Sequence, residues 1–411
     1  MRIERFQIQG FKSIADVTVE GLADINVFFG LNDVGKSNIF QALELWYWLI
    51  TAGATASRRG VRPVKYEIPS ANLQARFGSS LLRIGHENHI SITAELIGHR
   101  SDQILIKSDQ RLVVGIIVKL FDNEVKCELT YEFQQKGIPL ETQMPFEQLA
   151  SSLAQFHVVH AARRLQSEHR SNKKQGDLIS DSNLKQALFY AYLSSDLKQK
   201  QRLNAIKRIL AEPPYNLGEL DVALDPQTDR IDIGFVRASG RLPIENLGSG
   251  SQQLLLVLGQ IFLNDCPIIA FEEPEMNLSP QSQEYLMLAL RKLMQDPAIQ
   301  LQQLFISTHS PYLEFAENFY DVTFDAVAGT QVVRSTQEKH RQHFSVTPIG
   351  PDTGARLNSQ NQVKLYDGVV QDLALQRGDL VIFVRNDAGH WEIRAAKELA
   401  QELQAVTNGQ G

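Results

Sequence analysis

The chain has 411 residues, 43% of them hydrophobic and 21% charged, with a formal net charge of -6 at pH 7. This composition is typical of an ordinary soluble globular protein, neither disordered nor membranous, and the length predicts two or three folding units. The negative charge gives no overall attraction to nucleic acid, so DNA contact would need a local basic surface. With no long apolar segment and no signal peptide, we expect a cytoplasmic protein without membrane contact, and two distant cysteines without a CxxC pair argue against disulfide or zinc chemistry.

The N-terminal part of the sequence predicts strands followed by one helix. Strand patterns at residues 3–8 and 17–19 flank a turn at 10–13, and a short apolar run at 25–29 predicts a buried strand. A helix with one apolar face is expected over about 37–50. Between residues 89 and 133, three segments that alternate or run apolar, rich in β-branched residues, predict an antiparallel sheet.

The second half predicts strands and helices in alternation. A helical segment is expected over 182–212, where Pro213 and Pro214 end it, and a strand over 231–236. A Gly-Ser turn at 248–251 then leads into an apolar helix, a strand ending at Phe271, a helix over 281–294 and a strand over 304–308. This order at close spacing predicts a parallel α/β core. Further on we expect a hairpin over 327–333, a strand over 380–384 and a final helix from about Ile393.

A phosphate-binding loop is the strongest motif. Residues 30–37, GLNDVGKS, match GxxxxGK[ST] and lie between a buried strand and a helix, as the mechanism requires. Two glycines let backbone amides approach phosphate oxygens, the lysine reaches the β- and γ-phosphates, and the serine hydroxyl binds Mg²⁺. The motif predicts a site for ATP and Mg²⁺, and its predicted ATP-binding residues are Gly30, Asn32, Gly35, Lys36, Ser37 and Asn38.

Acidic residues follow the next apolar strand. Glu272 and Glu273 end the segment PIIAFEE, at the carboxyl end of a strand, where ligands of open α/β sheets bind. Alone, the pair would be a solvated strand end, but beside a phosphate loop Glu272 is expected to hold Mg²⁺ and Glu273 to act as general base. His309 follows the neighbouring strand and is expected to contact the γ-phosphate, although a lone histidine there is more often structural.

A second Gly-rich turn precedes the apolar helix. Gly248, Ser249 and Gly250 lie where a helix N-terminus could bind an anion, although a serine N-cap is the simpler alternative. Because one ATP needs only one cradle, this turn is expected to complete the site of a neighbouring molecule.

Taken in order, the turn GFKS, the loop GLNDVGKSN, the segment NLGSGSQQ and the ends IIAFEEPEMNLSP and FISTHSPYL resemble the ATPase heads of the SMC, RecF and OLD-like group. The resemblance implies an α/β P-loop NTPase head of the ABC type that hydrolyses ATP. It also implies that Gly248, Ser249 and Gly250 act in trans, with Lys36, Ser37, Glu272, Glu273 and His309 in the phosphate-loop, Walker B and switch-histidine roles. OLD nucleases carry a Toprim domain with a DxD pair, and no such pair follows Pro311.

This resemblance implies a division of the chain. We expect an N-terminal lobe of the head with an antiparallel β subdomain at 1–160, a short helical arm insertion at 161–215, a C-terminal lobe at 216–315 and a mixed α+β accessory region at 316–411.

Two functions remain open at this point. The resemblance to stand-alone OLD-like ATPases implies an oligomer, a dimer or larger, that acts as a sensor or scaffold for a separate effector protein in prokaryotic anti-phage defence. The alternative is a RecF-like ATPase that clamps DNA. Its basis is a set of basic residues in the middle region, although such runs are usually solvated faces. They are Arg163, Arg164, His169, Arg170, Lys173, Lys174, Lys198, Lys200, Arg202, Lys207 and Arg208. A transporter subunit is disfavoured.

Overall fold

The computed structural model describes residues 1–56, 64–83, 89–98, 106–107, 109–140, 146–153, 155–160, 183–213, 215–225, 227–264, 266–295, 299–310, 313, 318–335, 381–385 and 391–395. The chain divides into two compact units, Met1–Arg334 and Ser335–Gly411.

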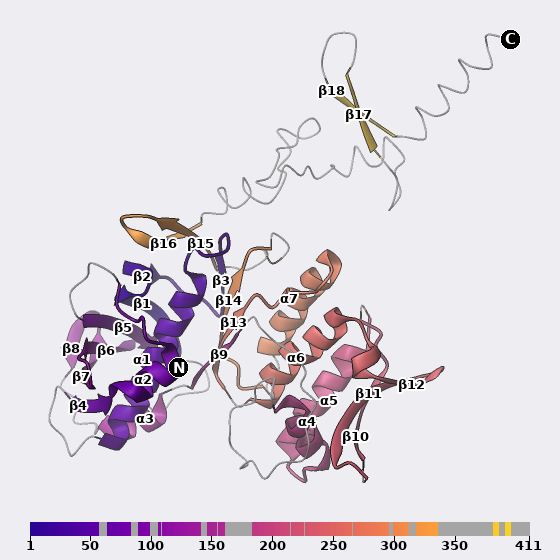
Figure 1. Ribbon diagram of the computed structural model, residues 1–411, viewed down its shortest axis with the longest axis horizontal. Helices are drawn as coiled ribbons and strands as arrows, with labels where there is room; N and C mark the ends of the chain where they lie inside the picture. Colours follow the sequence, from indigo (N-terminus) through magenta and orange to yellow (C-terminus); the bar gives the residue numbers. More distant parts are fainter. Residues whose placement is uncertain are drawn as a thin grey trace. The chain divides into compact units, whose positions relative to one another are not determined.

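One mixed sheet organises the first unit (Figure 1). Within the described residues its strand order is β4-β7-β6-β5-β1-β2-β16-β15-β3-β14-β13-β9, with β8 paired to β7. Its strands are β1 (Arg2–Phe11), β2 (Ile14–Glu20), β3 (Ile25–Phe29), β4 (Val64–Pro69), β5 (His89–Ile97), β6 (Gln110–Leu120), β7 (Glu124–Gln135), β8 (Ile138–Leu140), β9 (Phe156–Val159), β13 (Ile268–Glu272), β14 (Gln303–Thr308), β15 (Asn318–Asp325) and β16 (Gly329–Arg334).

The sheet has two halves with different pairing. From β4 to β2 all neighbours are antiparallel, and their alternating burial leaves one face for the core. From β15 through β3, β14 and β13 to β9 all neighbours are parallel, and β13 and β14 are buried along their whole length. The predicted parallel α/β core and antiparallel subdomain are both confirmed. Because the parallel strands run the same way, the residues that follow them meet at one edge.

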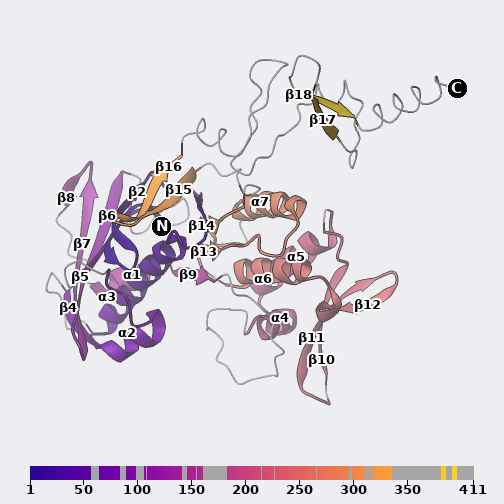
Figure 2. The same cartoon turned by 45° about the horizontal axis from the view of Figure 1, so that its top comes forward.

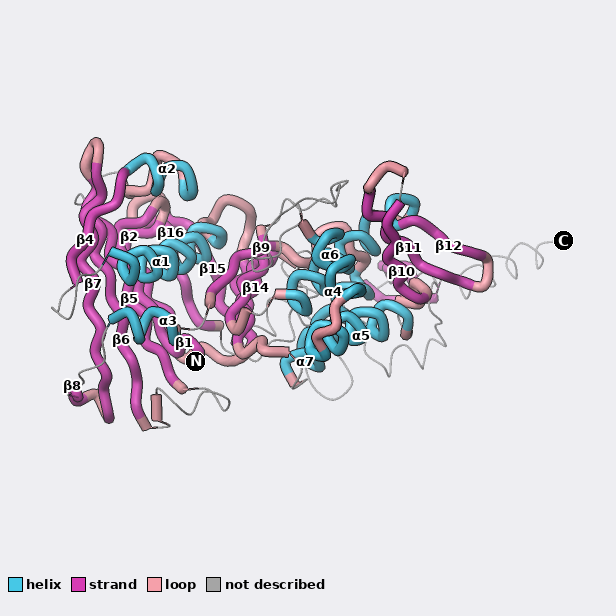
Figure 3. Tube along the Cα trace, turned by 90° about the horizontal axis from the view of Figure 1, so that it is seen from below, coloured by secondary structure: helices cyan, strands magenta, loops and turns pink. Residues whose placement is uncertain are grey.

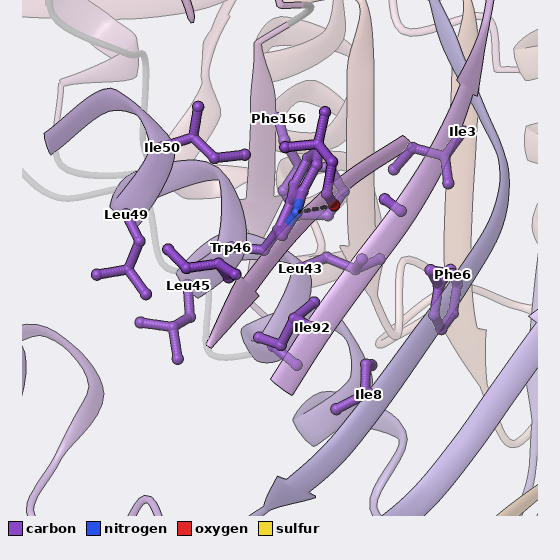
Figure 4. Close-up of a cluster of buried hydrophobic side chains, with 14 of the residues drawn as sticks. Ile3, Phe6, Ile8, Leu43, Leu45, Trp46, Leu49, Ile50, Ile92 and Phe156 are labelled. Carbon is purple, nitrogen blue, oxygen red and sulfur yellow. Dashed lines mark hydrogen bonds between the residues drawn. The ribbon is translucent and has the colours of Figure 1, made fainter. Parts of the chain in front are cut away.

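Helix α1 (Lys36–Ala56) packs its apolar side on the sheet next to α3 (Phe146–Ser152), and α2 (Ser70–Phe77) packs near β4. Figure 4 shows the core beneath α1, where Leu43 and Trp46 lie among Ile3, Phe6 and Ile92. The Trp46 indole also donates a hydrogen bond of 3.1 Å to the carbonyl of Val114, so the buried ring leaves no polar atom without a partner.

Helices α4 (Leu184–Leu193), α5 (Leu197–Ala211) and α6 (Ser249–Leu263) contact one another, and α7 (Pro280–Met294) lies beside α6 (Figure 2). We predicted a single helical run over 182–212, but it breaks between α4 and α5. Asp196 caps α5 by accepting a hydrogen bond of 2.9 Å from the backbone amide of Lys198, and the extended backbone of this cap ends the continuity.

A small antiparallel sheet of β10 (Glu219–Asp225), β11 (Arg230–Arg237) and β12 (Gly240–Pro243) packs against α4 and α5 (Figure 3). A short 3₁₀ turn, η1 (Ile244–Asn246), connects it to α6. Helices α4 and α5 therefore contact both α6 and this small sheet.

The C-terminal region differs from expectation at two points. We began the accessory region at residue 316, but β15 and β16 pair with β3 and β2 in the main sheet, so the first unit extends to Arg334. In the second unit, β17 (Val381–Arg385) matches the predicted strand and pairs with β18 (Trp391–Ala395). The helix predicted to start near Ile393 is wrong at that start, because alternating residues there form β18; residues 396–411 lie outside the described part.

Candidate functional site at the edge of the parallel strands

The phosphate loop connects β3 to α1. The backbone at Gly30 lies so close to the carbonyl of Val322 that a Cβ atom there would overlap it. Gly35 has a φ of 96°, which L side chains rarely adopt, and a Cβ there would lie 2.5 Å from the Ser13 hydroxyl. Both glycines are therefore required by this loop, and the space they leave is the cradle that phosphate oxygens need.

The base of the loop is held by residues from distant parts of the chain. The Thr330 hydroxyl donates to the Val34 carbonyl at 2.9 Å and shares a hydrogen bond of 2.6 Å with the Ser13 hydroxyl. The Asn38 amide donates to the same Ser13 oxygen at 2.7 Å. Predicted as an ATP contact, Asn38 thus has a structural partner on the β1–β2 turn, and Asn32 lies exposed on the loop.

Lys36 is buried at the start of α1. Its ammonium donates to the carbonyls of Gly30 and Leu31, both at 2.7 Å. Burial lowers the pKa of Lys36, while the charges of Glu273, Glu275 and Asp33 oppose that shift. An anion bound beside this ammonium would therefore offset the cost of burying its charge. The next residue, Ser37, is exposed.

The two predicted acidic residues differ in environment. Glu272 ends β13 and is buried, with Oε2 at 3.2 Å from Nδ1 of His160, the residue after β9. Glu273 is partly exposed and has a φ of 45°, unusual for a residue with a side chain. Its backbone amide donates to the carbonyl of Ser307 at 2.8 Å, which fixes this strained turn against β14.

His309 follows β14 and lies beside Glu273. Its Nδ1 is 3.4 Å from Oε1 of Glu273 and 3.8 Å from Oε1 of Glu275, and its side chain is half exposed. The structure thus brings the predicted base and the predicted switch histidine together, and it adds Glu275, a buried carboxyl that we did not predict.

The Gly-Ser turn lies at the start of α6. Gly248 is the N-cap residue without a side-chain capping bond, and Gly248 and Ser249 are exposed. Gly250 packs against the loop after Glu273, since a Cβ there would lie 2.8 Å from the carbonyl oxygen of Asn277. Exposed backbone amides at a helix N-terminus are available to an anion from another molecule.

Several functional candidates were missed from sequence. His160 and Thr308 both lie at the carboxyl ends of parallel strands, and the position after each apolar strand was the available signal. For Ser13 and Thr330 no local signal exists, since their contact joins segments more than 300 residues apart.

The residues fit MgATP. The glycine cradle and the buried ammonium suit a triphosphate, and Ser37 with Glu272 supplies oxygen donors of the kind that Mg²⁺ prefers. Within the described residues no group of three or more His, Cys, Asp or Glu is arranged to hold a metal.

The basic residues considered for DNA contact lie mainly outside the described part. The six at positions 163–174 fall there. Of those on α5, Arg202 is buried, whereas Lys198, Lys200 and Arg208 are exposed. Within the described residues, the exposed basic side chains among these candidates are therefore a few on α5.

The profile of the AAA_21 family, "AAA domain, putative AbiEii toxin, Type IV TA system", matches residues 25–316, more than half of the chain. The chain belongs to this family. The match spans the phosphate loop, the Gly-Ser turn, both acidic residues and His309, and it places the protein among P-loop ATPases of the ABC type.

The individual proteins and solved structures with similarity to this chain are distant. An uncharacterized protein of Methanocaldococcus jannaschii is 27% identical over 134 residues, which cover 33% of this chain and 16% of that protein. The SMC head domain of Thermotoga maritima is 13% identical with a TM-score of 0.45, covering 82% of this chain and 100% of that one. A Pyrococcus furiosus Smc head with an extended coiled coil, bound to the C-terminal domain of ScpA, is 14% identical with a TM-score of 0.47, covering 82% and 97%.

Within the described residues of this AAA_21 chain, no helix has both the length and the apolar character needed to cross a membrane.

Proposed function

We propose that this AAA_21 protein binds ATP with Mg²⁺ and hydrolyses it, in a composite site formed by two heads. The observation that carries the proposal is the meeting of Lys36, Glu273 and His309 at the carboxyl edge of β3, β13 and β14. A buried cation, a carboxylate and an imidazole at one sheet edge, beside a glycine cradle, suit phosphoryl transfer to water.

Each residue has a distinct role in this proposal. Amides of the loop around Gly35 and the Lys36 ammonium bind the phosphates, and Ser37 with Glu272 would hold Mg²⁺. An ion held there would neutralise charge on the phosphate oxygens. Glu273 accepts a proton from the attacking water, and His309 donates a hydrogen bond toward the γ-phosphate.

The second head supplies the remaining contacts. Gly248 and Ser249 are exposed and Gly250 is half-buried at the start of α6, and their backbone amides would face the γ-phosphate bound by the other molecule, so that ATP lies between two copies. ATP binding then favours the closed dimer and hydrolysis releases it, because only the triphosphate binds both surfaces.

We further propose that this cycle controls a separate effector protein in prokaryotic anti-phage defence. The family description, which names a toxin of a type IV toxin–antitoxin system, supports a two-component arrangement of this kind. The ATPase would then work as a cytoplasmic switch.

The test uses the Glu273→Gln variant, which keeps the size of the side chain but cannot accept the proton. We expect it to bind ATP, to hydrolyse it at least roughly a hundredfold more slowly than the unmodified protein, and to double its molar mass in light scattering when MgATP is added. Lys36→Ala is the non-binding control, and Glu219→Gln, an exposed carboxylate on β10, is the matched control for charge removal.

The outcomes separate the two parts of the proposal. ATP turnover that is equal in the unmodified protein and in Glu273→Gln would exclude this site as the catalytic one. A mass that stays at one copy under every condition would exclude the composite site. A molar mass of several copies that does not change with MgATP, together with normal turnover, would leave the proposed ATPase activity standing. It would exclude assembly driven by nucleotide binding.

A further inference from the structure

Glu275 lies outside the two acidic positions that the mechanism uses. It belongs to the turn between β13 and α7, and its side chain is only 3% exposed. Two left-handed residues, Glu273 with a φ of 45° and Asn277 with a φ of 64°, bracket this turn and fold it back against the end of β14. The amide of Leu278 donates to the carbonyl of Glu275 at 2.9 Å, which fixes the backbone.

Its carboxyl holds the end of β14. Oε1 accepts a hydrogen bond of 2.5 Å from the Thr308 hydroxyl and one of 3.4 Å from the backbone amide of His309. The Thr308 oxygen in turn accepts from the amide of Ser310 at 2.9 Å. Three consecutive residues, with His309 in the middle, are thereby connected to one carboxyl group.

The same oxygen faces the imidazole. Nδ1 of His309 lies 3.8 Å from Oε1 of Glu275 and 3.4 Å from Oε1 of Glu273. Because the His309 side chain is half exposed, packing alone does not fix its rotamer. Two carboxylates on the Nδ1 side favour a hydrogen on that nitrogen and direct Nε2 away from them.

Burying the carboxyl group of Glu275 costs free energy that a purely structural side chain would not require. Oε2 of Glu275 is buried and has no hydrogen-bond partner within the described residues. Burial raises the pKa of Glu275, against the hydrogen bond from Thr308. A neutral side chain of similar volume would fill the space at lower cost, so the retained carboxyl indicates a task at this site.

We propose that Glu275 is a positioning residue for ATP hydrolysis: it holds the Thr308–Ser310 segment and orients the His309 imidazole beside Glu273. This inference rests on the proposed ATPase function. Glu275 itself touches neither nucleotide nor water in this account; it acts through His309.

The experiment is a double-mutant cycle on the full chain. Turnover at saturating MgATP and the affinity for ATP are measured for Glu275→Ala, His309→Ala and the double variant, with single-turnover hydrolysis of labelled ATP to resolve slow rates. We expect Glu275→Ala to lower kcat roughly ten- to a hundredfold, as a misplaced catalytic group does, and to change the affinity for ATP less than roughly threefold, since no phosphate contact is removed. The double variant should be no slower than His309→Ala.

Conservative variants keep the test valid if Glu275→Ala does not fold. Glu275→Gln retains an acceptor for Thr308 and for the His309 amide, so it should recover part of the lost kcat. Thr308→Val removes the connecting hydroxyl at constant volume and should lower kcat without weakening ATP binding. Glu219→Ala, on the exposed edge of β10, should match the unmodified protein.

The results distinguish this inference from the proposed function. Turnover in the unmodified protein with an unchanged kcat in Glu275→Ala overturns the positioning role alone. Losses that multiply fully in the double variant also overturn it, because independent effects would mean that Glu275 does not act through His309. No turnover above the Lys36→Ala background in the unmodified protein overturns the ATPase function and the inference with it.

Discussion

Gly35 and Gly30 permit a quantitative test of the close packing of the phosphate loop. Alanine would destabilise the protein at both positions, but through different contributions. At Gly35 the backbone has a φ of 96°, and a Cβ would overlap the Thr330 hydroxyl and lie 2.5 Å from that of Ser13. Alanine in a left-handed conformation costs about 1–2 kcal/mol, and an overpacked contact costs about 1–3 kcal/mol. Gly35→Ala should therefore lower the free energy of unfolding by about 2–5 kcal/mol.

Two further variants separate these contributions. Gly137 has a φ of 78° with no atom near its Cβ position, so Gly137→Ala carries the conformational cost alone, about 1–2 kcal/mol. Gly30 has no left-handed φ, but its Cβ would overlap the carbonyl of Val322, so Gly30→Ala carries the contact cost alone, about 1–3 kcal/mol.

The assay is urea unfolding of the three variants, paired with a titration of fluorescent ATP. Gly35→Ala and Gly30→Ala should both weaken nucleotide binding, because each change displaces the loop, whereas Gly137→Ala should bind as the unmodified protein does. Equal unfolding free energies for Gly35→Ala and Gly137→Ala, with ATP affinity intact in both, would refute the close packing of the loop.

Thr330→Val should weaken ATP affinity roughly fivefold, since a hydrogen bond worth about 1 kcal/mol no longer supports the loop; the exposed Thr323→Val on β15 is the control, and equal affinities in a calorimetric titration would contradict it. Burial of Glu245 is the largest single influence and opposes its charge, but the hydrogen bond from Lys185, a backbone hydrogen bond and the charges of Lys185 and Arg230 together outweigh burial and lower the pKa of Glu245. The bridge therefore stabilises above the ordinary glutamate pKa of about 4.3 and is lost as the pH falls through the lower folded value. Glu245→Gln should lower Tm by about 1–2 °C at pH 7, with a difference that shrinks toward pH 3, and a constant difference would contradict the assignment. Glu272→Gln should raise the Mg²⁺ concentration for half-maximal ATPase activity roughly tenfold, and an unchanged Mg²⁺ titration would remove Glu272 from the metal site.

The sequence predicts the parallel core because its signals are local. An apolar strand, a Gly-rich loop and a helix occur within some thirty residues around Lys36, and β13, α7 and β14 repeat the alternation. The polar residues after β13 and β14 could be expected at one edge, since parallel strands share their direction. The fold class is confirmed, and the roles of the individual site residues stay predictions that the variants above test.

The remaining features depend on contacts between distant segments. Thr330 reaches the phosphate loop only because β16 pairs with β2 at Gly329 and Ile14. The role of Glu275 follows from the fold of its turn against Thr308, which a single buried glutamate in a sequence does not indicate. The break between α4 and α5 had a local signal in the cap residue Asp196, which the helical spacing on both sides obscured.

The pairing of β3 has a consequence during synthesis. Both neighbours of β3 come late in the chain, β14 at Gln303–Thr308 and β15 at Asn318–Asp325. At about 5–20 residues per second, a ribosome needs roughly 14–55 s to produce the 273 residues between β3 and β14. During this interval the apolar strand ahead of the phosphate loop has two unpaired edges, the arrangement that invites aggregation and chaperone binding. We therefore expect the phosphate loop to take the form described here only when the β15–β16 hairpin has left the ribosome, so a nascent chain that stops before Thr330 should bind ATP more weakly than the full chain.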